Sequence, residues 1–501
     1  MEHVSVLINK CTRGGGGGEK EGAIQQSALL CLRQIINRIG TSHSHKFISV
    51  TRSLLDAIGT KTGPVLHSSA TSNALLCISE SCASLTVRLI PLLPTILSTA
   101  LKYIEQSDKS SGLVLSSLIL IRTVIQTLPR FISSFVPSII KKICSSDFLE
   151  VAGKEDLLTE ATLVRESLPV GVPSSVLLSA ITEALPLVMK DGKSSVIALV
   201  NILRTCIGSL TKKVDVNQPV LIDIFTALLE YRSNYEHETE SDVSEVETEV
   251  NQSFTDLVVK LSEASFKPTL NKLLVWADSG DKILTFYHLI RDVAKKLKVL
   301  FLLFADQLVD SIVSLLSSCH LVNNKGLLPF SDSSYASSII KTNLCLQFLF
   351  DTLQICFLHD KGSFLNKERS QQLMEPLVEQ ITNTLSSEDN ELYLTLMRSH
   401  LSPCIAQLAV AASSGETQWK KLNQQLLMKT RESKPMVRLC ALQIAGSMYS
   451  KLGSEVNVIL PEIIPFLSEL MEDECEDVER EVQETIKSIE AVTGESVQQY
   501  L

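Results

Sequence analysis

The sequence has no excess of basic residues. It holds 46 Lys and Arg against 56 Asp and Glu in 501 residues, which gives a formal net charge of −10. A domain that binds nucleic acid on its own usually has the opposite balance, because its affinity comes from cations that displace counterions from phosphates. The composition therefore excludes a general nucleic-acid clamp. Any contact with RNA must be local or made through partners.

Aromatic residues are also scarce, at 5% of the chain, whereas apolar residues together make up 45%. The apolar fraction excludes global disorder. A core of Leu, Ile, Val and Ala with few rings favours helices over a β-sandwich or barrel. The length would predict about three compact domains, unless the chain is an array of repeats.

Long apolar runs and paired cysteines are missing. The stretches 113–121 and 299–305 both stop at charged residues, well short of the roughly 20 apolar residues of a membrane helix. The first residues lack the segments of a signal peptide. The 12 cysteines include no C-x-x-C pair, which predicts reduced, buried thiols. We therefore expect an intracellular protein that makes no membrane contact.

Helical periodicity is present in nearly every window. The clearest internal repeat begins at Val437 and again 41 residues later at Val478. Its aligned apolar positions follow a helical spacing, and each copy ends in a glycine suited to a helix C-cap. The aligned pairs are Val437 with Val478, Ala441 with Val482, Ala445 with Ile486, Met448 with Ile489, and Gly453 with Gly494.

Prolines mark the first helix of several two-helix units. They are Pro91, Pro94, Pro137, Pro461 and Pro465. Proline is tolerated at the start of a helix, where its missing N–H would have no partner, and it bends a helix further in. A unit of about 40 residues with proline in its first helix resembles a HEAT repeat. The sequence thus predicts an all-α fold, a HEAT-type α-solenoid of stacked antiparallel helix pairs.

Four segments are expected along this solenoid. They are HEAT-like helical repeats at 1–235, an acidic linker at 236–250, a family-specific helical domain continuing the solenoid at 251–400, and C-terminal HEAT repeats at 401–501. Residues 236–249 hold seven carboxylates and no Lys or Arg, which indicates a linker or the frayed start of a helix. We also expect a flexible glycine-rich loop at 14–18 and a polar loop at 317–338.

The motifs of catalysis and metal binding are absent or incomplete. The glycine run does not continue into the Gly-Lys-Ser/Thr of a phosphate loop. His43 and His45 form an H-x-H pair without further nearby ligands, and the neighbours Cys319 and His320 need not face each other. We interpret both pairs as structural. The sequence predicts no catalytic residue, no cofactor, no metal site and no small-molecule substrate.

Two local charge patterns suggest partners. A stretch with more basic than acidic residues ends in Arg291, Lys295, Lys296 and Lys298. Helical spacing would place the first, second and fourth of these on one face, as a contact for RNA phosphate or an acidic protein. The alternative is an ordinary solvated helix face, because no aromatic residues interleave. Ten acidic residues at 469–490 indicate a surface for a basic partner or a solvated capping repeat.

Residues 251–306 carry motifs of one family. The motifs are Val258-Val259-Lys260-Leu261-Ser262-Glu263, Phe266-Lys267-Pro268, Trp276-Ala277, Thr285-Phe286-Tyr287, Leu297-Lys298 and Leu300-Phe301. Together with residues 435–501 they resemble the C-terminal portion of the large HEAT-repeat, small nucleolar RNA-associated subunit of the small-subunit processome. Chains of that family are far longer, so this sequence is either a portion of such a chain or a short form.

The resemblance implies a scaffold of the nucleus and nucleolus without catalytic residues. Such a scaffold supports processing of pre-ribosomal RNA and is linked to rDNA transcription by RNA polymerase I. The implied partners are other processome assembly proteins and a ribonucleoprotein of pre-rRNA and small nucleolar RNA, contacted directly or through those proteins. The alternative is a HEAT-repeat transport receptor or regulatory adaptor, because fold alone does not separate these functions.

Overall fold

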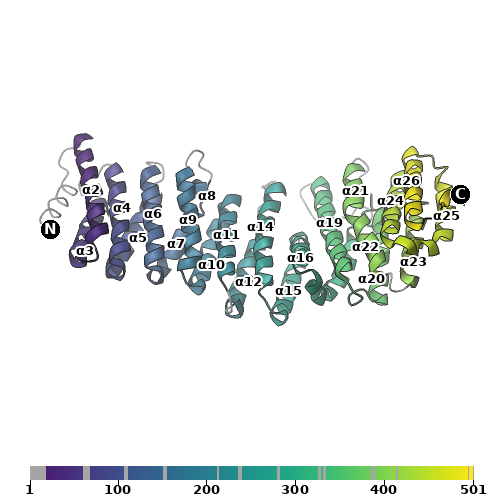
Figure 1. Cartoon of the computed structure of the whole chain (residues 1–501), viewed down its shortest axis with the longest axis horizontal. Helices are drawn as coiled ribbons and strands as arrows, with labels where there is room; N and C mark the ends of the chain where they lie inside the picture. The colour runs from purple at the N-terminus through teal and green to yellow at the C-terminus, as the bar shows by residue number, and fades with distance from the viewer. Residues whose placement is uncertain are drawn as a thin grey trace. The chain divides into compact units, whose positions relative to one another are not determined.

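Helices make up every regular element of the described residues in this computed structural model (Figure 1). The described residues are 19–59, 68–105, 111–149, 155–210, 214–234, 240–278, 282–324, 329–330, 335–384, 390–412, 416–494 and 496–499. They belong to two compact units, Met1–Leu261 and Ser262–Leu501. The all-α prediction is confirmed. The glycine-rich loop expected at 14–18 lies outside the described residues.

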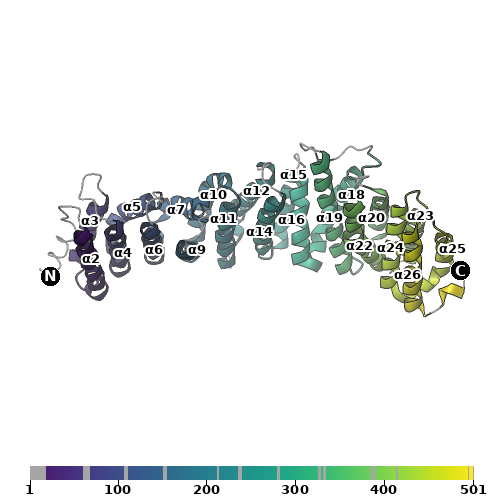
Figure 2. The same cartoon turned by 90° about the horizontal axis from the view of Figure 1, so that it is seen from above.

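The first unit stacks its helices in two layers (Figures 1 and 2). One layer consists of α2 (Glu19–Ile39), α4 (Ser68–Leu85), α6 (Ser111–Thr127), α9 (Glu155–Gly171), α11 (Lys193–Ser209) and α14 (Glu240–Val258). The other consists of α3 (Ser44–Gly59), α5 (Leu93–Glu105), α7 (Val136–Ile143), α10 (Ser174–Lys190) and α12 (Val214–Leu229). Short helices lie between them: η1 (Thr86–Leu92), η2 (Pro129–Phe131), η3 (Ser133–Phe135), α8 (Ser146–Leu149) and α13 (Tyr231–Asn234). Consecutive helices of each layer pack on one another and on the opposite layer, as in the predicted solenoid.

The second unit has the same plan. Its first layer is α16 (Ile283–Leu297), α19 (Tyr335–His359), α22 (Ser402–Ala412), α24 (Pro435–Leu452) and α26 (Glu476–Thr493). Opposite them lie α15 (Glu263–Ala277), α18 (Val309–Ser318), α20 (Lys367–Glu379), α23 (Glu416–Lys429) and α25 (Leu460–Leu470). The remaining elements are η4 (Lys298–Phe301), α17 (Leu302–Ala305), η5 (Asp306–Leu308), η6 (Gln380–Thr382), α21 (Asn390–Leu396), the π-turn η7 (Met397–Leu401), η8 (Gly453–Val458) and η9 (Val497–Gln499). Each helix of the first layer packs on the next, which buries the apolar face that one pair could not cover alone.

The internal repeat corresponds to α24 and α26, which pack directly on each other. All eight aligned apolar side chains are buried. Gly453 and Gly494 follow the two helices with φ of 64° and 73°, a region that an L side chain rarely adopts. The predicted apolar stripe and the two glycine caps are confirmed.

The acidic stretch contains a helix. Residues 240–250 belong to α14, which packs on α11, so the linker interpretation is wrong for these residues and the helix-start alternative describes them. Val243, Val246 and Val250 lie buried on one face of this helix and supply the apolar stripe that the carboxylates hid in the sequence. Residues 236–239 lie outside the described part of the chain.

Two helical runs, Ser69–Glu105 and Ile283–Ser318, are long and apolar enough by composition to cross a membrane. In the structure each run is divided into separate helices that turn and pack within the solenoid, α4 against α2 and α6, and α16 against α19. A membrane-spanning segment needs one continuous helix of about 20 residues. Packing within the solenoid core accounts for the apolar character of both runs.

Most described cysteines are buried thiols, as predicted. Nine are buried, whereas Cys475 is partly exposed and Cys31 is exposed, so the expectation of burial is wrong for Cys31. Burial raises the pKa of the Cys82 thiol to about 12, because the charged thiolate would lose its hydration. Cysteine therefore serves this fold as a small apolar side chain.

Candidate partner-binding surface

The predicted basic positions do not share one helical face. Arg291, Lys295 and Lys296 lie on α16, which ends at Leu297. Lys298 has a φ of 53°, which takes the backbone out of the right-handed helical region and begins η4. The expectation that Lys298 continues the helical face is therefore wrong.

Arg291 is held by contacts within the second unit. Its guanidinium donates hydrogen bonds to Oδ1 of Asp292 at 3.0 and 2.8 Å, and it lies 4.6 Å from the ring centroid of Phe348 on α19. A guanidinium stacked on a ring and paired with a carboxylate has little capacity left for a partner. The structure thus assigns Arg291 to the packing of α16 on α19.

The three lysines are exposed. Lys295 has 53% of its side chain exposed, and its Nζ lies 4.0 Å from Oδ2 of Asp351 on α19. The other oxygen of Asp351 lies 2.7 Å from Nδ1 of His400. Lys296 and Lys298 are also exposed. An exposed pair at that distance contributes little energy, so Lys295 can exchange Asp351 for another anion at small cost.

Exposed aliphatic side chains follow the lysines. Val299, Leu300 and Leu303 are 51%, 59% and 54% exposed, whereas the neighbouring Phe301 and Phe304 are buried. We call Lys295, Lys296, Lys298, Val299, Leu300 and Leu303 the basic–aliphatic turn. The exposed aliphatic side chains were not predicted from the sequence, because an apolar run such as 299–305 is typical of a buried core. Only the turn at Lys298 directs these side chains outward.

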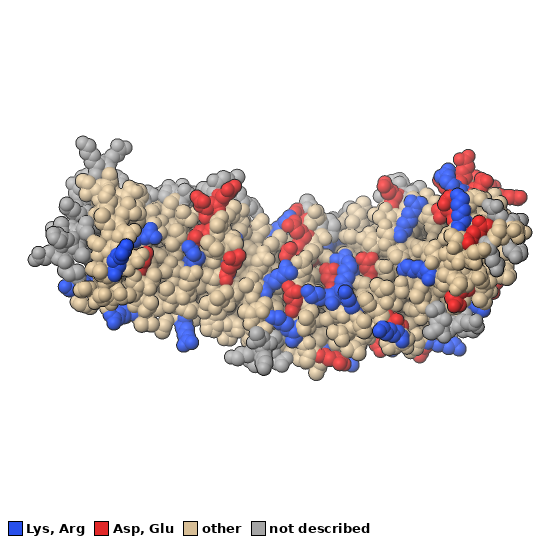
Figure 3. All heavy atoms as spheres, viewed as in Figure 1, with Lys and Arg blue, Asp and Glu red and all other residues tan. Residues whose placement is uncertain are grey.

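Charge elsewhere is mixed. On the described part of the face in Figure 3, Lys and Arg lie scattered among Asp and Glu. The acidic stretch at 469–490 runs into α26, with exposed carboxylates at Glu472, Glu474, Glu476, Asp477, Glu479 and Glu484. Its two interpretations, a surface for a basic partner and a solvated repeat, both stay predictions.

The pairs His43–His45 and Cys319–His320 lie in structural positions. His43 lies in the turn before α3 and His45 in its first turn, and both are exposed. His320 is buried, with Nε2 3.0 Å from the Glu379 carbonyl and 3.1 Å from Thr382 Oγ1, so its ring joins the end of α18 to η6. Within the described residues, no group of three or more His, Cys, Asp or Glu is placed to hold a metal ion.

Known proteins have sequences similar to this one. The family described as the BP28CT (NUC211) domain matches residues 213–365, which include the basic–aliphatic turn. Over 494 residues, 96% of this chain, the sequence is 35% identical to HEAT repeat-containing protein 1 of Homo sapiens. The chain is a homologue of that protein. It spans 23% of the relative's length.

A fungal relative and one solved structure extend the comparison. U3 small nucleolar RNA-associated protein 10 of Chaetomium globosum is 27% identical over 451 residues, covering 85% of this chain and 24% of its own. A crystal structure of importin beta matches 100% of this chain and 61% of its own at 10% identity, with a TM-score of 0.41. The stacking of the helix pairs, and not this match, establishes the solenoid.

Proposed function

We propose that this chain is a non-catalytic scaffold of the nucleolar small-subunit processome. The observation that carries the proposal is the 35% identity with HEAT repeat-containing protein 1 across 96% of the chain. A further relative is named for its association with U3 small nucleolar RNA. In this role the chain supports pre-rRNA processing and the biogenesis of the small ribosomal subunit.

The architecture suits a scaffold. Within each unit the stacked helix pairs contact mainly their neighbours, so both layers keep an exposed side where partners can bind. The one described histidine beside a cysteine, His320, uses its ring to hold two helices together. The proposal therefore assigns binding to this chain, without turnover or a small-molecule substrate.

The same proposal also states where the chain acts and which transcription it supports. The chain acts in the nucleus and nucleolus, with other processome proteins and the pre-rRNA and snoRNA ribonucleoprotein as its partners, and it supports rDNA transcription by RNA polymerase I. The name of the fungal relative supports the association with U3 small nucleolar RNA, whereas the transcriptional link rests on the family resemblance of the sequence alone.

Affinity purification tests the proposed scaffold. The tagged full chain should concentrate in nucleoli and recover U3 small nucleolar RNA, pre-rRNA and processome proteins above the level of an unrelated helical-repeat protein with the same tag. Recovery should persist in part after nuclease treatment, because the net charge of −10 favours protein contacts over RNA contacts. A signal at the nuclear rim or in the cytoplasm, with none of these components recovered, would reject the scaffold and support a transport receptor.

The basic–aliphatic turn is the contact surface that we propose for this role. It combines three lysines with Val299, Leu300 and Leu303, so it matches a protein segment with acidic and apolar side chains better than it matches RNA. Exposed aliphatic side chains beside charges are typical of surfaces that a partner covers.

Replacing Lys295, Lys296 and Lys298 together by Glu should reduce crosslinking of the chain to its partners by about tenfold, because like charges then face the acidic partner. Quantitative crosslinking with mass spectrometry measures the change. The matched control replaces the exposed Lys361, Lys367 and Lys421 of the same unit by Glu, with the same change in net charge. Equal crosslinking of the two variants would remove the turn from consideration.

A further inference from the structure

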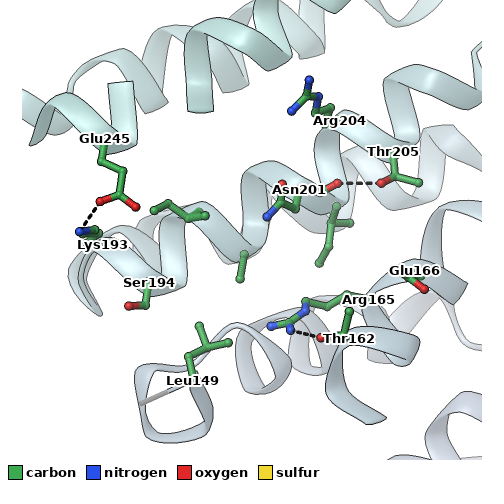
Figure 4. A pocket seen from close by; sticks show the side chains of 13 residues that line it. Leu149, Thr162, Arg165, Glu166, Lys193, Ser194, Asn201, Arg204, Thr205 and Glu245 are labelled. Atoms are coloured by element: carbon green, nitrogen blue, oxygen red, sulfur yellow. Dashed lines mark hydrogen bonds and ion pairs between the residues drawn. The ribbon is translucent and has the colours of Figure 1, made fainter. Parts of the chain in front are cut away.

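A cleft opens between α9 and α11 in the first unit (Figure 4). Its volume is about 580 Å³, and α8 and the first turns of α14 border it. Clefts of roughly 300–1,000 Å³ are of the size that binds small ligands or a few residues of a peptide. The sequence motifs pointed to none of its residues, because they come from separate helices.

Arg165 of α9 supplies the unusual charge of this cleft. Its Nη1 donates to the Ile143 carbonyl at 3.2 Å and its Nη2 to Thr162 Oγ1 at 2.7 Å, and both acceptors are neutral. None of the described carboxylates lies within ion-pair distance of its guanidinium. Burial lowers the pKa of Arg165, because the charged group loses hydration there. A partly buried cation with only neutral acceptors gains free energy when an anion reaches it.

The other two cations of the cleft are already neutralised. Lys193 lies 2.8 Å from Asp242 and 2.5 Å from Glu245. Arg204 lies 2.9 Å from Asp256. Within the described part of the chain, Arg165 is therefore the one lining cation without a carboxylate at ion-pair distance, and the neighbouring Glu166 favours its charged form only from farther away.

The rest of the cleft suits a peptide. Asn201 projects from α11 toward the hollow that Arg165 enters from α9 (Figure 4). Its side-chain amide is exposed and bonded to no described group, so it can pair with a peptide backbone. The apolar part of the cleft wall includes Leu149, Ile197 and Ile202.

We propose that this cleft binds an extended acidic peptide of a partner protein. An Asp or Glu carboxylate pairs with the guanidinium of Arg165, a neighbouring aliphatic side chain lies against Leu149 and Ile197, and the amide of Asn201 hydrogen-bonds the peptide backbone. The inference is independent of the proposed processome role.

An RNA strand fits the cleft less well. Glu166 lines it as well, and this exposed carboxylate would repel a row of phosphates more strongly than it repels a single carboxylate. One cation without a direct ion pair matches one carboxylate, whereas a phosphate backbone is bound by several cations together. The charge count of the cleft thus favours a peptide.

Fluorescence anisotropy on the full chain tests this inference. The probes are two short labelled peptides with leucines in a Gly/Ser background, one with a central Asp and one with Asn in its place. The wild-type chain should bind the Asp peptide at least about tenfold more tightly, which is the gain from one charge-assisted pair. R165M should remove this preference, whereas R130M, at an exposed arginine of the same unit outside the cleft, should keep it.

R165M also removes the hydrogen bond to the Ile143 carbonyl, and losing that bond can disturb folding. A second variant therefore tests the cleft without changing Arg165. I197D places a carboxylate at a half-buried position on the cleft wall and should abolish binding of the Asp peptide while circular dichroism stays unchanged. Equal affinity of the wild-type chain for the two peptides would overturn the proposal, as would a preference that survives in R165M. Displacement of the Asp peptide by oligouridylate at equal concentration would assign the cleft to RNA and overturn it as well.

Discussion

Replacing Glu247 by Ala should lower the free energy of unfolding around α14 by about 3–5 kcal/mol, since it removes a buried carboxylate that pairs with the guanidinium of Arg232. Arg232 of α13 and Glu247 of α14 form two parallel bonds of 2.8 Å, Nε to Oε1 and Nη2 to Oε2. Their side chains are only 9% and 3% exposed. Hydrogen exchange of residues 240–258 in the full chain measures the loss.

Two further variants define the cause of the Glu247 effect. Glu105, 58% exposed and paired with Lys142, is the matched control in the same unit, and E105A should cost at most about 1 kcal/mol. The double variant R232M/E247L removes both charges and keeps the volume, so it should regain most of the stability lost in E247A. If E247A and E105A had equal effects, the buried pair would not be a major support of α14.

Replacing Asp473 by Ala should lower the free energy of unfolding of α26 by about 3 kcal/mol, because Asp473 is the carboxylate partner of Arg438 on α24. Arg438 Nη2 lies 2.6 Å from Oδ1, and Nε lies 2.7 Å from Oδ2. The same carboxylate accepts the Cys475 N–H at 2.9 Å, just before α26 begins. Hydrogen exchange of residues 476–493 reports the change. D477A, which breaks an exposed pair with Arg480 in α26, is the control and should cost at most about 1 kcal/mol.

Acid should weaken this contact in the wild-type chain. The hydrogen bonds from Arg438 hold the pKa of Asp473 below its usual range, against the opposing effect of burial. The folded-state pKa thus lies below the unfolded value of about 3.9, so the stabilisation is complete above pH about 4 and is lost as pH falls through the folded-state pKa. The difference between wild type and D473A should be constant near neutral pH and shrink in acid. A difference that grew in acid would contradict this assignment.

Sequence periodicity predicted the fold because it is a local property. The stripe from Val437 and its copy from Val478 needed only the spacing of apolar residues and a closing glycine. The same reasoning failed at residues 240–250, where seven carboxylates between 236 and 249 outweighed three valines. The buried Glu247 pairs with Arg232 of α13, and periodicity does not reveal such a pair.

The candidate surface was predicted only in part. The basic cluster was visible in the sequence, but helical spacing could not reveal that Lys298 leaves α16 at positive φ or that Phe348 holds Arg291. Both depend on neighbours more than 40 residues away or on a backbone conformation that lysine seldom adopts. The exposed Val299, Leu300 and Leu303 follow from that same turn.

By itself the sequence determined the helical class, the two-helix repeat, the lack of basic excess and the family resemblance, since each of these is encoded in composition or in short-range order. Tertiary structure decided which charges are neutralised and which remain available. Stacking α9 on α11 and α11 on α14 pairs Lys193 and Arg204 with carboxylates but leaves Arg165 with neutral acceptors. Compensation of a charge depends on atoms that distant helices bring together, and the spacing of residues along the chain does not specify it.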